Sequence, residues 1–284
     1  MSEVLSSMSE LMRVGGWALR GLGYKFGAAE RGIRFVAWTE AVGGQAIAGL
    51  RRAESMIASS IEAPTTSFCR DAGGVWHVAA HNRHLVEVGP PAIDLATADA
   101  RANAIGHVSL GEVFGFELVP SLADLLVRRG LVALLVYRVA DGETGNAARR
   151  GQWLIAGGTE RPVFTFGSTA GDARKALRNA LETGGPAAEM VARDMDDANG
   201  SASLGYLGAM ALAPESPIAR RLLEHARSSA PGTESIDYVG RLQNAYRDGI
   251  PMRVEDLQYL YDLEMRTWAP TSERSRAQAG YGVY

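Results

Sequence analysis

The order of apolar and polar positions predicts helices at the start of the chain. Residues 1–60 are rich in alanine, and Ile33 and Val36 recur at the spacing that places side chains on one helix face. Two consecutive glycines, Gly43 and Gly44, are unfavourable inside a helix, so we expect a helix to end at this pair.

The centre of the chain, residues 61–170, has the pattern of β-strands. Short runs of β-branched and aromatic residues are bounded here by Gly, Pro or Asp, which favours strands that end in turns. One helix interrupts them, because Ser121 can cap an apolar segment that stops at Gly130. The predicted strands are 74–80, 84–89, 131–139, 151–157 and 163–167.

Helices return in the last region, 171–284, with one further strand at 204–213. Helical ends around a mixed, largely antiparallel central sheet give an α+β fold class, which we expect to form a single domain over residues 1–284. The predicted helix starts are Asp172, Ser216 followed by Pro217, Thr233 and Arg253.

Composition and charge exclude several classes of function. The apolar fraction of 46% supplies a buried core, and a net charge of −3 argues against nucleic-acid binding, which needs excess positive charge. Cys69 is the only cysteine, so neither an intramolecular disulfide nor a cysteine-rich metal cluster can form. A signal peptide and a membrane-spanning apolar run are both missing from the sequence, so a cytoplasmic location without membrane contact is expected.

Motifs for nucleotide binding and for a hydrolase nucleophile are missing. The glycines between Gly21 and Gly27 depart by one residue from the dinucleotide-binding spacing, and they follow a predicted helix rather than a strand. No P-loop and no G-x-S-x-G motif occurs. The acidic run 194–199 resembles a calcium loop, but Ala198 and Gly205 stand where ligands are required, so a turn is expected. These observations predict an activity without a cofactor.

Three of the five histidines, His77, His81 and His84, lie within eight residues of the sequence. On a helix, this spacing would place all three on one face, where they could bind a metal ion. The flanking residues instead predict two consecutive strands, so that the three side chains diverge across a hairpin. A divalent metal ion at this cluster is therefore the alternative to ordinary strand and turn histidines.

The C-terminal tail gathers polar residues and glycines after Pro270 has ended the last helix. Hydroxyl groups, a guanidinium and glycine N–H groups together suit a carboxylate or a phosphate. Glu273 would act there as an acid or base. The alternative is a frayed polar terminus. The candidate residues of the tail are Thr271, Glu273, Ser275, Arg276, Gly280 and Gly282.

Four short segments resemble, in the same order, an uncharacterised bacterial family catalogued as a domain of unknown function, number 3726. The resemblance implies a compact bacterial protein and supplies no established activity. It suggests that the two ends of the chain line one cleft. The matching residues are Arg20, Gly21, Gly23, Tyr24, Gly27, Ala29 and Glu30; Gly89, Pro90 and Asp94; Asn244 to Gly249; and Pro270, Glu273, Ser275, Arg276, Gly280 and Gly282.

Two hypotheses about function follow. The first is a cofactor-free enzyme of small-molecule metabolism, of hydrolase, lyase or isomerase type, that acts on a small polar or anionic ligand. Its predicted catalytic residues are Glu273, Glu30 and Ser275, and its predicted binding residues are Arg276, Thr271, Gly280, Gly282 and Tyr24.

The second hypothesis is a non-catalytic subunit or binding protein. It would pack on a partner subunit, or on a second copy of itself as a homo-oligomer, through the aromatic residues Trp17, Phe35 and Trp38. A contiguous exposed patch of these three side chains would favour this hypothesis, whereas their burial beside a polar cleft would favour the enzyme.

Overall fold

The structure is a computed structural model that describes residues 2–61, 66–139, 151–158, 160, 162–181, 185–199, 205–228 and 230–268. It confirms the α+β class, with a mixed and mostly antiparallel sheet and helical N- and C-terminal regions. Within these ranges, no helix has the length and hydropathy that a membrane span requires. The prediction of one domain over 1–284 stays a prediction.

Helices form both ends of the described chain and cover the sheet. The helices are α1 (Met8–Gly21), α2 (Phe26–Gly43), α3 (Ala46–Ile61), α4 (Leu85–Asn103), the 3-10 helix η1 (Phe116–Leu118), α5 (Val119–Arg128), α6 (Gly171–Leu181), α7 (Pro186–Asn199), α8 (Pro217–Arg227), α9 (Tyr238–Asp248) and α10 (Val254–Arg266). The strands are β1 (Glu3–Ser6), β2 (Ser67–Arg70), β3 (Trp76–His84), β4 (Ile105–Phe114), β5 (Val132–Arg138), β6 (Gly151–Gly157), β7 (Val163–Ser168), β8 (Gly205–Leu212), β9 (Thr233–Ile236) and β10 (Ile250–Arg253).

Eight strands form the main sheet in the order β2-β3-β4-β8-β5-β6-β7-β9. Strands β3 and β4 are parallel and are connected through helix α4, whereas the other neighbours pair antiparallel. The short strands β1 and β10 form a separate antiparallel pair, which joins the two ends of the described chain.

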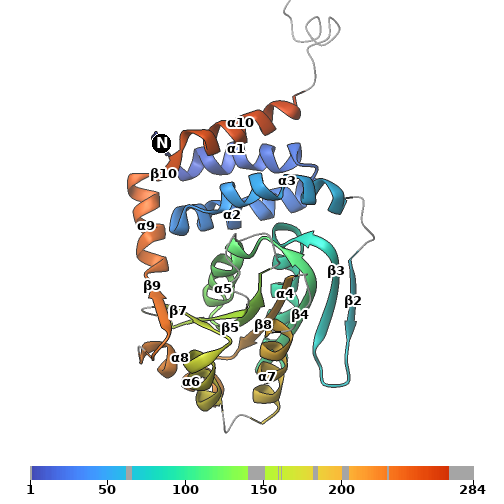
Figure 1. The fold of residues 1–284 in the computed structure, drawn as a ribbon, viewed down its shortest axis with the longest axis vertical. Coiled ribbons are helices and arrows are strands. Elements are labelled where there is room, and N and C mark those ends of the chain that lie inside the picture. The colour runs from blue at the N-terminus through green and yellow to red at the C-terminus, as the bar shows by residue number, and fades with distance from the viewer. Residues whose placement is uncertain are drawn as a thin grey trace, which may run out of the picture.

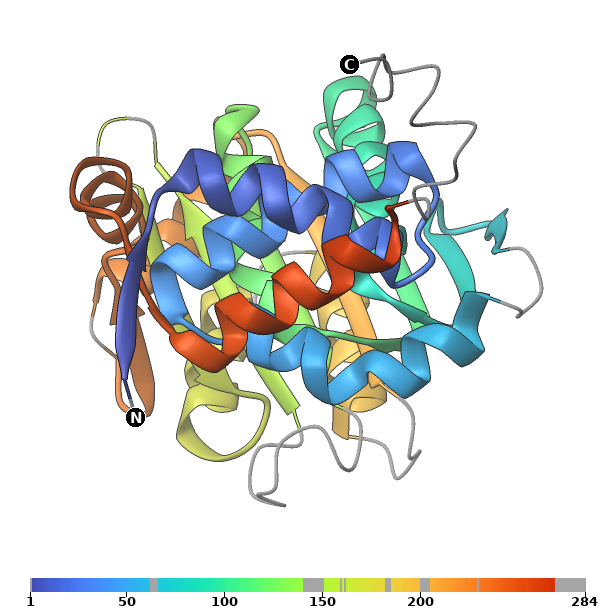
Figure 2. The ribbon, with the colours of Figure 1, turned by 90° about the horizontal axis from the view of Figure 1, so that it is seen from above.

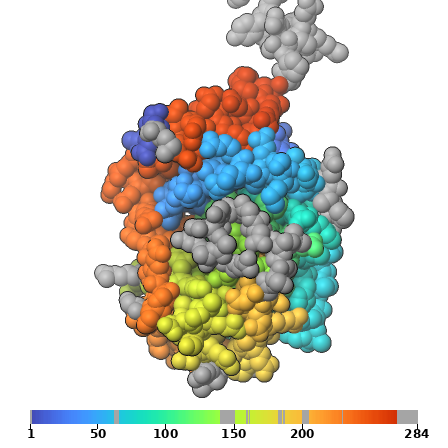
Figure 3. Space-filling model, viewed as in Figure 1, coloured from blue at the N-terminus to red at the C-terminus, as the bar shows by residue number. Residues whose placement is uncertain are grey.

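The helices lie in layers on the two faces of this sheet (Figure 1). Helices α4 and α5 pack on one face, and α6, α7 and α8 pack on the other. Helix α2 covers α4 and α5, and the pair α1 and α10 forms the outermost layer, as the view from above shows (Figure 2). The helices of both chain ends therefore occupy one end of the molecule, and α6 to α8 the opposite end (Figure 3).

Two apolar clusters, one on each side of the sheet, form the core. Strand β5 contributes to both, because its side chains alternate between the faces. Leu135 packs in the cluster toward α4 and α5, and Leu134 and Val136 pack in the cluster toward α6 to α8. A strand buried on both faces explains the continuous apolar run that predicted it.

Local signals in the sequence set several helix ends as predicted. Helix α2 ends at Gly43, and Gly44 adopts the left-handed conformation with φ 63° as its C-cap. Helix α8 starts with Ser216 as N-cap, whose hydroxyl accepts from the Ala219 N–H, and with Pro217 at the first helical position.

Three local predictions of helices and strands are wrong. Ser121 does not cap a helix, because α5 starts at Val119 and the buried Ser121 hydroxyl forms hydrogen bonds with Thr39 and Tyr238. The segment 84–89 forms the first turn of α4 instead of a strand, because His84 Nδ1 accepts from the Val86 N–H and caps a helix that the following alanines extend. A short apolar run fits a buried helix as well as a strand. The segment from Thr233 begins with strand β9, and helix α9 starts only after its N-cap, Asp237.

Candidate functional site

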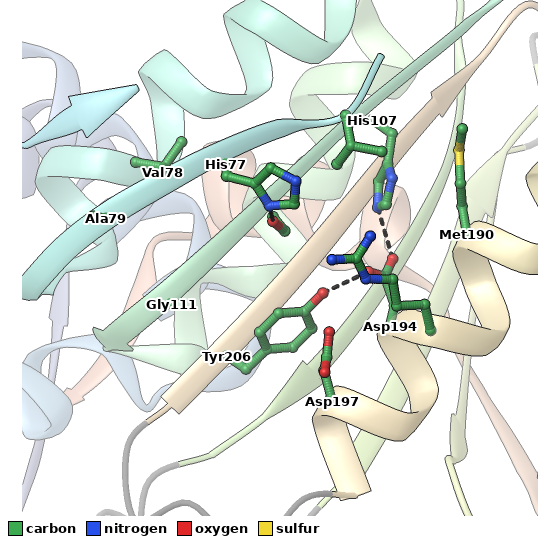
Figure 4. A pocket seen from close by; sticks show the side chains of 12 residues that line it. His77, Val78, Ala79, His107, Gly111, Met190, Asp194, Asp197 and Tyr206 are labelled. Carbon is green, nitrogen blue, oxygen red and sulfur yellow. Dashed lines mark hydrogen bonds and ion pairs between the residues drawn. The ribbon is translucent and has the colours of Figure 1, made fainter. Parts of the chain in front are cut away.

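A pocket of about 320 Å³ lies between the sheet and helix α7. This volume is at the lower end of the range for small-molecule sites. Its floor is the face of β3, β4 and β8 that looks toward α7, and its wall is one side of that helix (Figure 4). The lining residues are Val75, His77, Val78, Ala79, His107, Ser109, Gly111, Met190, Arg193, Asp194, Asp197 and Tyr206.

The register of the strands explains how the floor is built. His77 of β3, Ser109 of β4 and Gly208 of β8 are neighbours across the sheet, and Gly111 is the neighbour of Tyr206 one pair further along. Side chains of cross-strand neighbours lie on the same face. Small residues in these rows leave the space that the pocket occupies, and a Cβ added at Gly111 would meet no atom of the described residues within 4 Å.

A buried chain of hydrogen bonds joins the floor to α7. The His107 ring donates or accepts through Nε2 with Asp194 Oδ2 at 2.8 Å, and the Tyr206 hydroxyl donates to Asp194 Oδ1 at 2.5 Å. His107 and Asp194 are almost fully buried. The absence of a side chain at Gly208 is required here, because a Cβ would lie 2.4 Å from the Asp194 carboxylate.

The electrostatics of this chain keep the Tyr206 phenol protonated. Burial, and next the negative charge of Asp194, raise the pKa of Tyr206 far above its usual range. The second nitrogen of the His107 ring, Nδ1, is buried and has no hydrogen-bond partner among the described residues. The chain of Tyr206, Asp194 and His107 can therefore hold protons and pass them between the helix and the floor.

A second polar relay lies at the side of the pocket nearest β2. His77 contacts Ser109 Oγ at 2.8 Å through Nδ1 and Asp71 Oδ2 at 3.0 Å through Nε2. The hydrogen bond with His77, and next that from the Val75 N–H, lower the pKa of Asp71. Asp71 is consequently a charged partner that fixes the orientation of the imidazole.

The relay has the residue types of a hydrolytic triad but not its surroundings. Ser109 lies inside β4, with His77 of β3 on one side and Gly208 of β8 on the other. Its backbone amide is in the plane of a paired sheet, whereas a nucleophilic serine needs free N–H groups beside it to stabilise an oxyanion. Ser109 therefore orients His77 rather than attacking a substrate.

No family model and no curated protein matches this chain, so the resemblance to the uncharacterised bacterial family stays a prediction. Solved structures do match over almost the whole length. Malate dehydrogenase from Pyrococcus horikoshii OT3 has a TM-score of 0.64 and 14% identity, and the match covers 95% of this chain and 97% of that chain. The fold is the fold of these dehydrogenases.

Two further structures extend the comparison. Sulfolactate dehydrogenase from Methanocaldococcus jannaschii has a TM-score of 0.65 and 12% identity, over 92% of this chain and 96% of that chain. Delta1-piperideine-2-carboxylate reductase from Pseudomonas syringae has a TM-score of 0.60 and 15% identity, over 92% of this chain and 99% of that chain. All three proteins are named for oxidation or reduction of a small acid.

These matches correct two predictions. The expectation of hydrolase, lyase or isomerase chemistry is wrong, because the proteins that share the fold are dehydrogenases and a reductase. The expectation of an activity without a cofactor is wrong for the same reason, since protein side chains do not carry out hydride transfer alone. This chain lacks the glycine spacing of dinucleotide-binding motifs, so its sequence gave no sign of a cofactor.

The alternative of a binding protein rested on three aromatic side chains that the structure separates. Phe35 is buried, Trp38 is half-buried against Phe35 and the Arg128 guanidinium, and only Trp17 is well exposed. Trp17 is covered in part by Arg20, whose guanidinium carbon lies 4.4 Å from the ring centre. These three residues do not form one contiguous exposed patch.

The predicted catalytic and binding residues lie outside the pocket or outside the described residues. Glu30 is exposed on α2, and Tyr24 is buried in the loop before α2, where burial and next the charge of Glu87 raise its pKa. Neither residue lines the pocket. The tail residues lie outside the described part of the chain: Thr271, Glu273, Ser275, Arg276, Gly280 and Gly282.

The three clustered histidines have separate surroundings, although they all belong to β3. His77 lines the pocket, His81 lies 3.9 Å from Glu112, and His84 is fully buried as the cap of α4. The strand is irregular between the first and the last of them, since His81 has a φ of 51°. In the described part of the chain, no group of three potential ligands that could hold a metal ion occurs.

The sequence pattern did not indicate the three residues of the buried chain. Asp194 was expected in a turn, whereas the run 194–199 is the end of α7. No strand was expected around His107, because Gly106 and Gly111 interrupt the apolar pattern of β4. A polar ring in a strand between apolar neighbours is the signal that was available at His107.

Proposed function

We propose that this chain is an oxidoreductase that uses NAD(P)H to reduce a small carboxylic acid at the carbon next to the carboxylate. The single observation that carries the proposal is the buried chain of His107, Asp194 and Tyr206 in a pocket of this fold. The proteins with the same fold are named for malate, sulfolactate and delta1-piperideine-2-carboxylate, which all carry a hydroxyl or imine beside a carboxylate.

The floor of the pocket fits the flat ring of a nicotinamide. Ala79 and Gly111 are small, and where a side chain at Gly111 would project, no atom of the described part of the chain lies within 4 Å. A glycine at such a place lets a ring approach the backbone closely. The bound cofactor would supply the hydride. The volume of about 320 Å³ suits this ring together with a small acid rather than a whole dinucleotide.

The residues of the chain supply the proton that the reduction requires. The Tyr206 hydroxyl lines the pocket and reaches Asp194, which also binds His107. A proton given by Tyr206 to the substrate oxygen or nitrogen is replaced through Asp194 by the Nε2 proton of a positively charged His107 ring, which becomes neutral in the step. His77 and its partner Asp71 fix the opposite side of the pocket.

The test is the oxidation of NADH and NADPH by oxaloacetate, pyruvate and delta1-piperideine-2-carboxylate, followed by the absorbance of the reduced cofactor. We expect turnover with one of these acids, and a loss of kcat/KM of about a hundredfold or more in Asp194→Asn. Asp196→Asn is the matched control, because Asp196 is exposed on the same helix and binds Arg174. Equal activity of the two variants would contradict the proposed role of Asp194.

A further inference from the structure

Two opposite charges on helix α7 face the pocket one helical turn apart. Arg193 and Asp197 both line the pocket, and residues at this spacing are neighbours on a helix surface. The close-up view shows the Asp197 side chain beside Tyr206 (Figure 4). Such a pair commonly forms an ion pair, but no ion pair between these two described residues occurs within 4.0 Å.

Both charges are available to a ligand. The Arg193 side chain is 63% exposed, and its contact is a loose one, with Nη1 3.8 Å from Asp71 Oδ2. The Asp197 carboxylate is exposed and, within the described ranges, accepts no hydrogen bond. The remaining carboxylate of the pocket, Asp194, is different, because His107 and Tyr206 already engage both of its oxygens.

The two charges of α7 that a ligand in the pocket can still reach are therefore opposite in sign. Among the described lining residues, Arg193 is the one permanent cation, and Asp197 is the one carboxylate without a protein donor. A dicarboxylate such as malate would place its second carboxylate near Asp197, where like charges repel. A ligand with one carboxylate and one protonated nitrogen would meet an opposite charge at each end.

We infer that the pocket selects a zwitterionic substrate, a cyclic or open-chain imino acid that is reduced to an amino acid, with Arg193 on the carboxylate and Asp197 on the nitrogen. This inference rests on the proposed function. Asp197 is then a specificity-determining residue, because it stabilises the positive charge of the iminium ion. Arg193 binds the carboxylate of every acid that the pocket accepts.

The reaction that follows is balanced. Bound NAD(P)H would supply a hydride to the iminium carbon and would leave as NAD(P)+, and the π-electron pair of the C=N bond would move onto nitrogen. The product amine then takes one proton, which the chain of Tyr206, Asp194 and His107 supplies. The product is again a zwitterion, so the same two charges of α7 bind it.

Binding of the reaction product can be tested without a cofactor. Thermal unfolding of the full chain is measured with piperidine-2-carboxylate, cyclohexanecarboxylate, piperidine and malate as probes, since a ligand of the native state raises Tm. We expect piperidine-2-carboxylate to bind about tenfold more tightly than cyclohexanecarboxylate, which has the same ring and lacks the nitrogen. Asp197→Asn abolishes this preference, and Arg193→Gln weakens the binding of both carboxylates.

The controls are Asp196→Asn and Arg178→Gln, which change exposed residues of α7 and α6 away from the pocket and leave the preference intact. Malate binding as tightly as piperidine-2-carboxylate, or no shift with any probe, overturns the inference. Binding of piperidine-2-carboxylate without any NAD(P)H oxidation removes the proposed function and leaves the charge selection standing. Reduction of oxaloacetate alone supports the proposed function and overturns the inferred selection for a zwitterion.

Discussion

The two faces of strand β4 differ in kind, although both lie under helices. Toward α4, the strand presents Val108 and Leu110, which are fully buried in the larger apolar cluster. Toward α7, it presents His107, Ser109 and Gly111, which line the pocket. One strand thus provides packing on one side and polar, unfilled space on the other.

The helices on the two faces of β4 also differ in how closely they approach the strand. On the packed side, α4 comes so close that a Cβ at Gly106 would lie 1.9 Å from the Ala96 carbonyl oxygen. On the pocket side, α7 approaches through the Asp194 carboxylate, which bridges to His107 and Tyr206. A protein without a ligand at this place would gain stability from apolar side chains here, so the polar face points to function.

The largest effect is expected from Leu110→Ala on the packed side of β4. Removing this fully buried side chain leaves a cavity in the larger cluster, and the free energy of unfolding should fall by about 3 kcal/mol. Chemical denaturation measures the loss. Leu5→Ala, at a side chain that is 67% exposed, is the control and should change stability by less than about 0.5 kcal/mol.

A smaller effect on stability is expected when a methyl group is added on the pocket side of the sheet. Two glycine variants distinguish a clash with protein atoms from mere occupation of the pocket. Gly208→Ala places a Cβ 2.4 Å from the Asp194 carboxylate, so the bonds to His107 and Tyr206 must distort, with a loss of stability of about 2 kcal/mol. Gly111→Ala meets no protein atom within 4 Å and should change stability by less than about 0.5 kcal/mol.

Gly208→Ala and Gly111→Ala should differ less in ligand binding than in stability. The added methyl group of Gly111→Ala projects into the pocket, so it should reduce ligand-induced shifts in Tm while the unliganded Tm stays near that of the parent chain. If Gly111→Ala instead bound every probe as the parent chain does, the floor of the pocket would not be where ligands contact the protein.

The packed parts of the molecule, on both faces of the sheet, were largely predictable, because their signals are local. A continuous apolar run indicated β5, and Gly44 and Ser216 marked helix ends that the structure confirms. Each of these signals depends on neighbours along the chain, such as a cap that bonds a backbone N–H three residues away.

The pocket side was not predictable, because its residues are distant in sequence. His107 and Asp194 are 87 positions apart, and no local pattern indicates that β4 and α7 meet. The polar residues that build a site also break the periodicity that reveals strands, which hid β4 and made the end of α7 look like a turn. Local rules fail most often where function requires exceptions to them.

The smallest effect concerns a buried carboxylate on the packed side, which can be compared with Asp194. Glu40, in the last turn of α2, accepts from the Ile47 N–H at 3.0 Å and so caps the start of α3. Burial, and less strongly the charge of Asp256, raise its pKa above the ordinary value of 4.5. Unlike Asp194, it does not line the pocket between the sheet and α7.

Because the folded-state pKa of Glu40 is raised, its stabilising contribution is complete below the unfolded-state value and is lost as pH rises through the folded-state value. Gln at this position keeps an acceptor for the Ile47 N–H and never becomes charged. The free energy of unfolding of Glu40→Gln should therefore match that of the parent chain near pH 4.5. At higher pH it should exceed that of the parent chain progressively, by about 1 kcal/mol or less at neutrality. The control is Glu30→Gln, an exposed position on the same helix, whose Tm should follow the parent chain at every pH. Parallel pH profiles for Glu40→Gln and the parent chain would show that burial does not disfavour the charged carboxylate here.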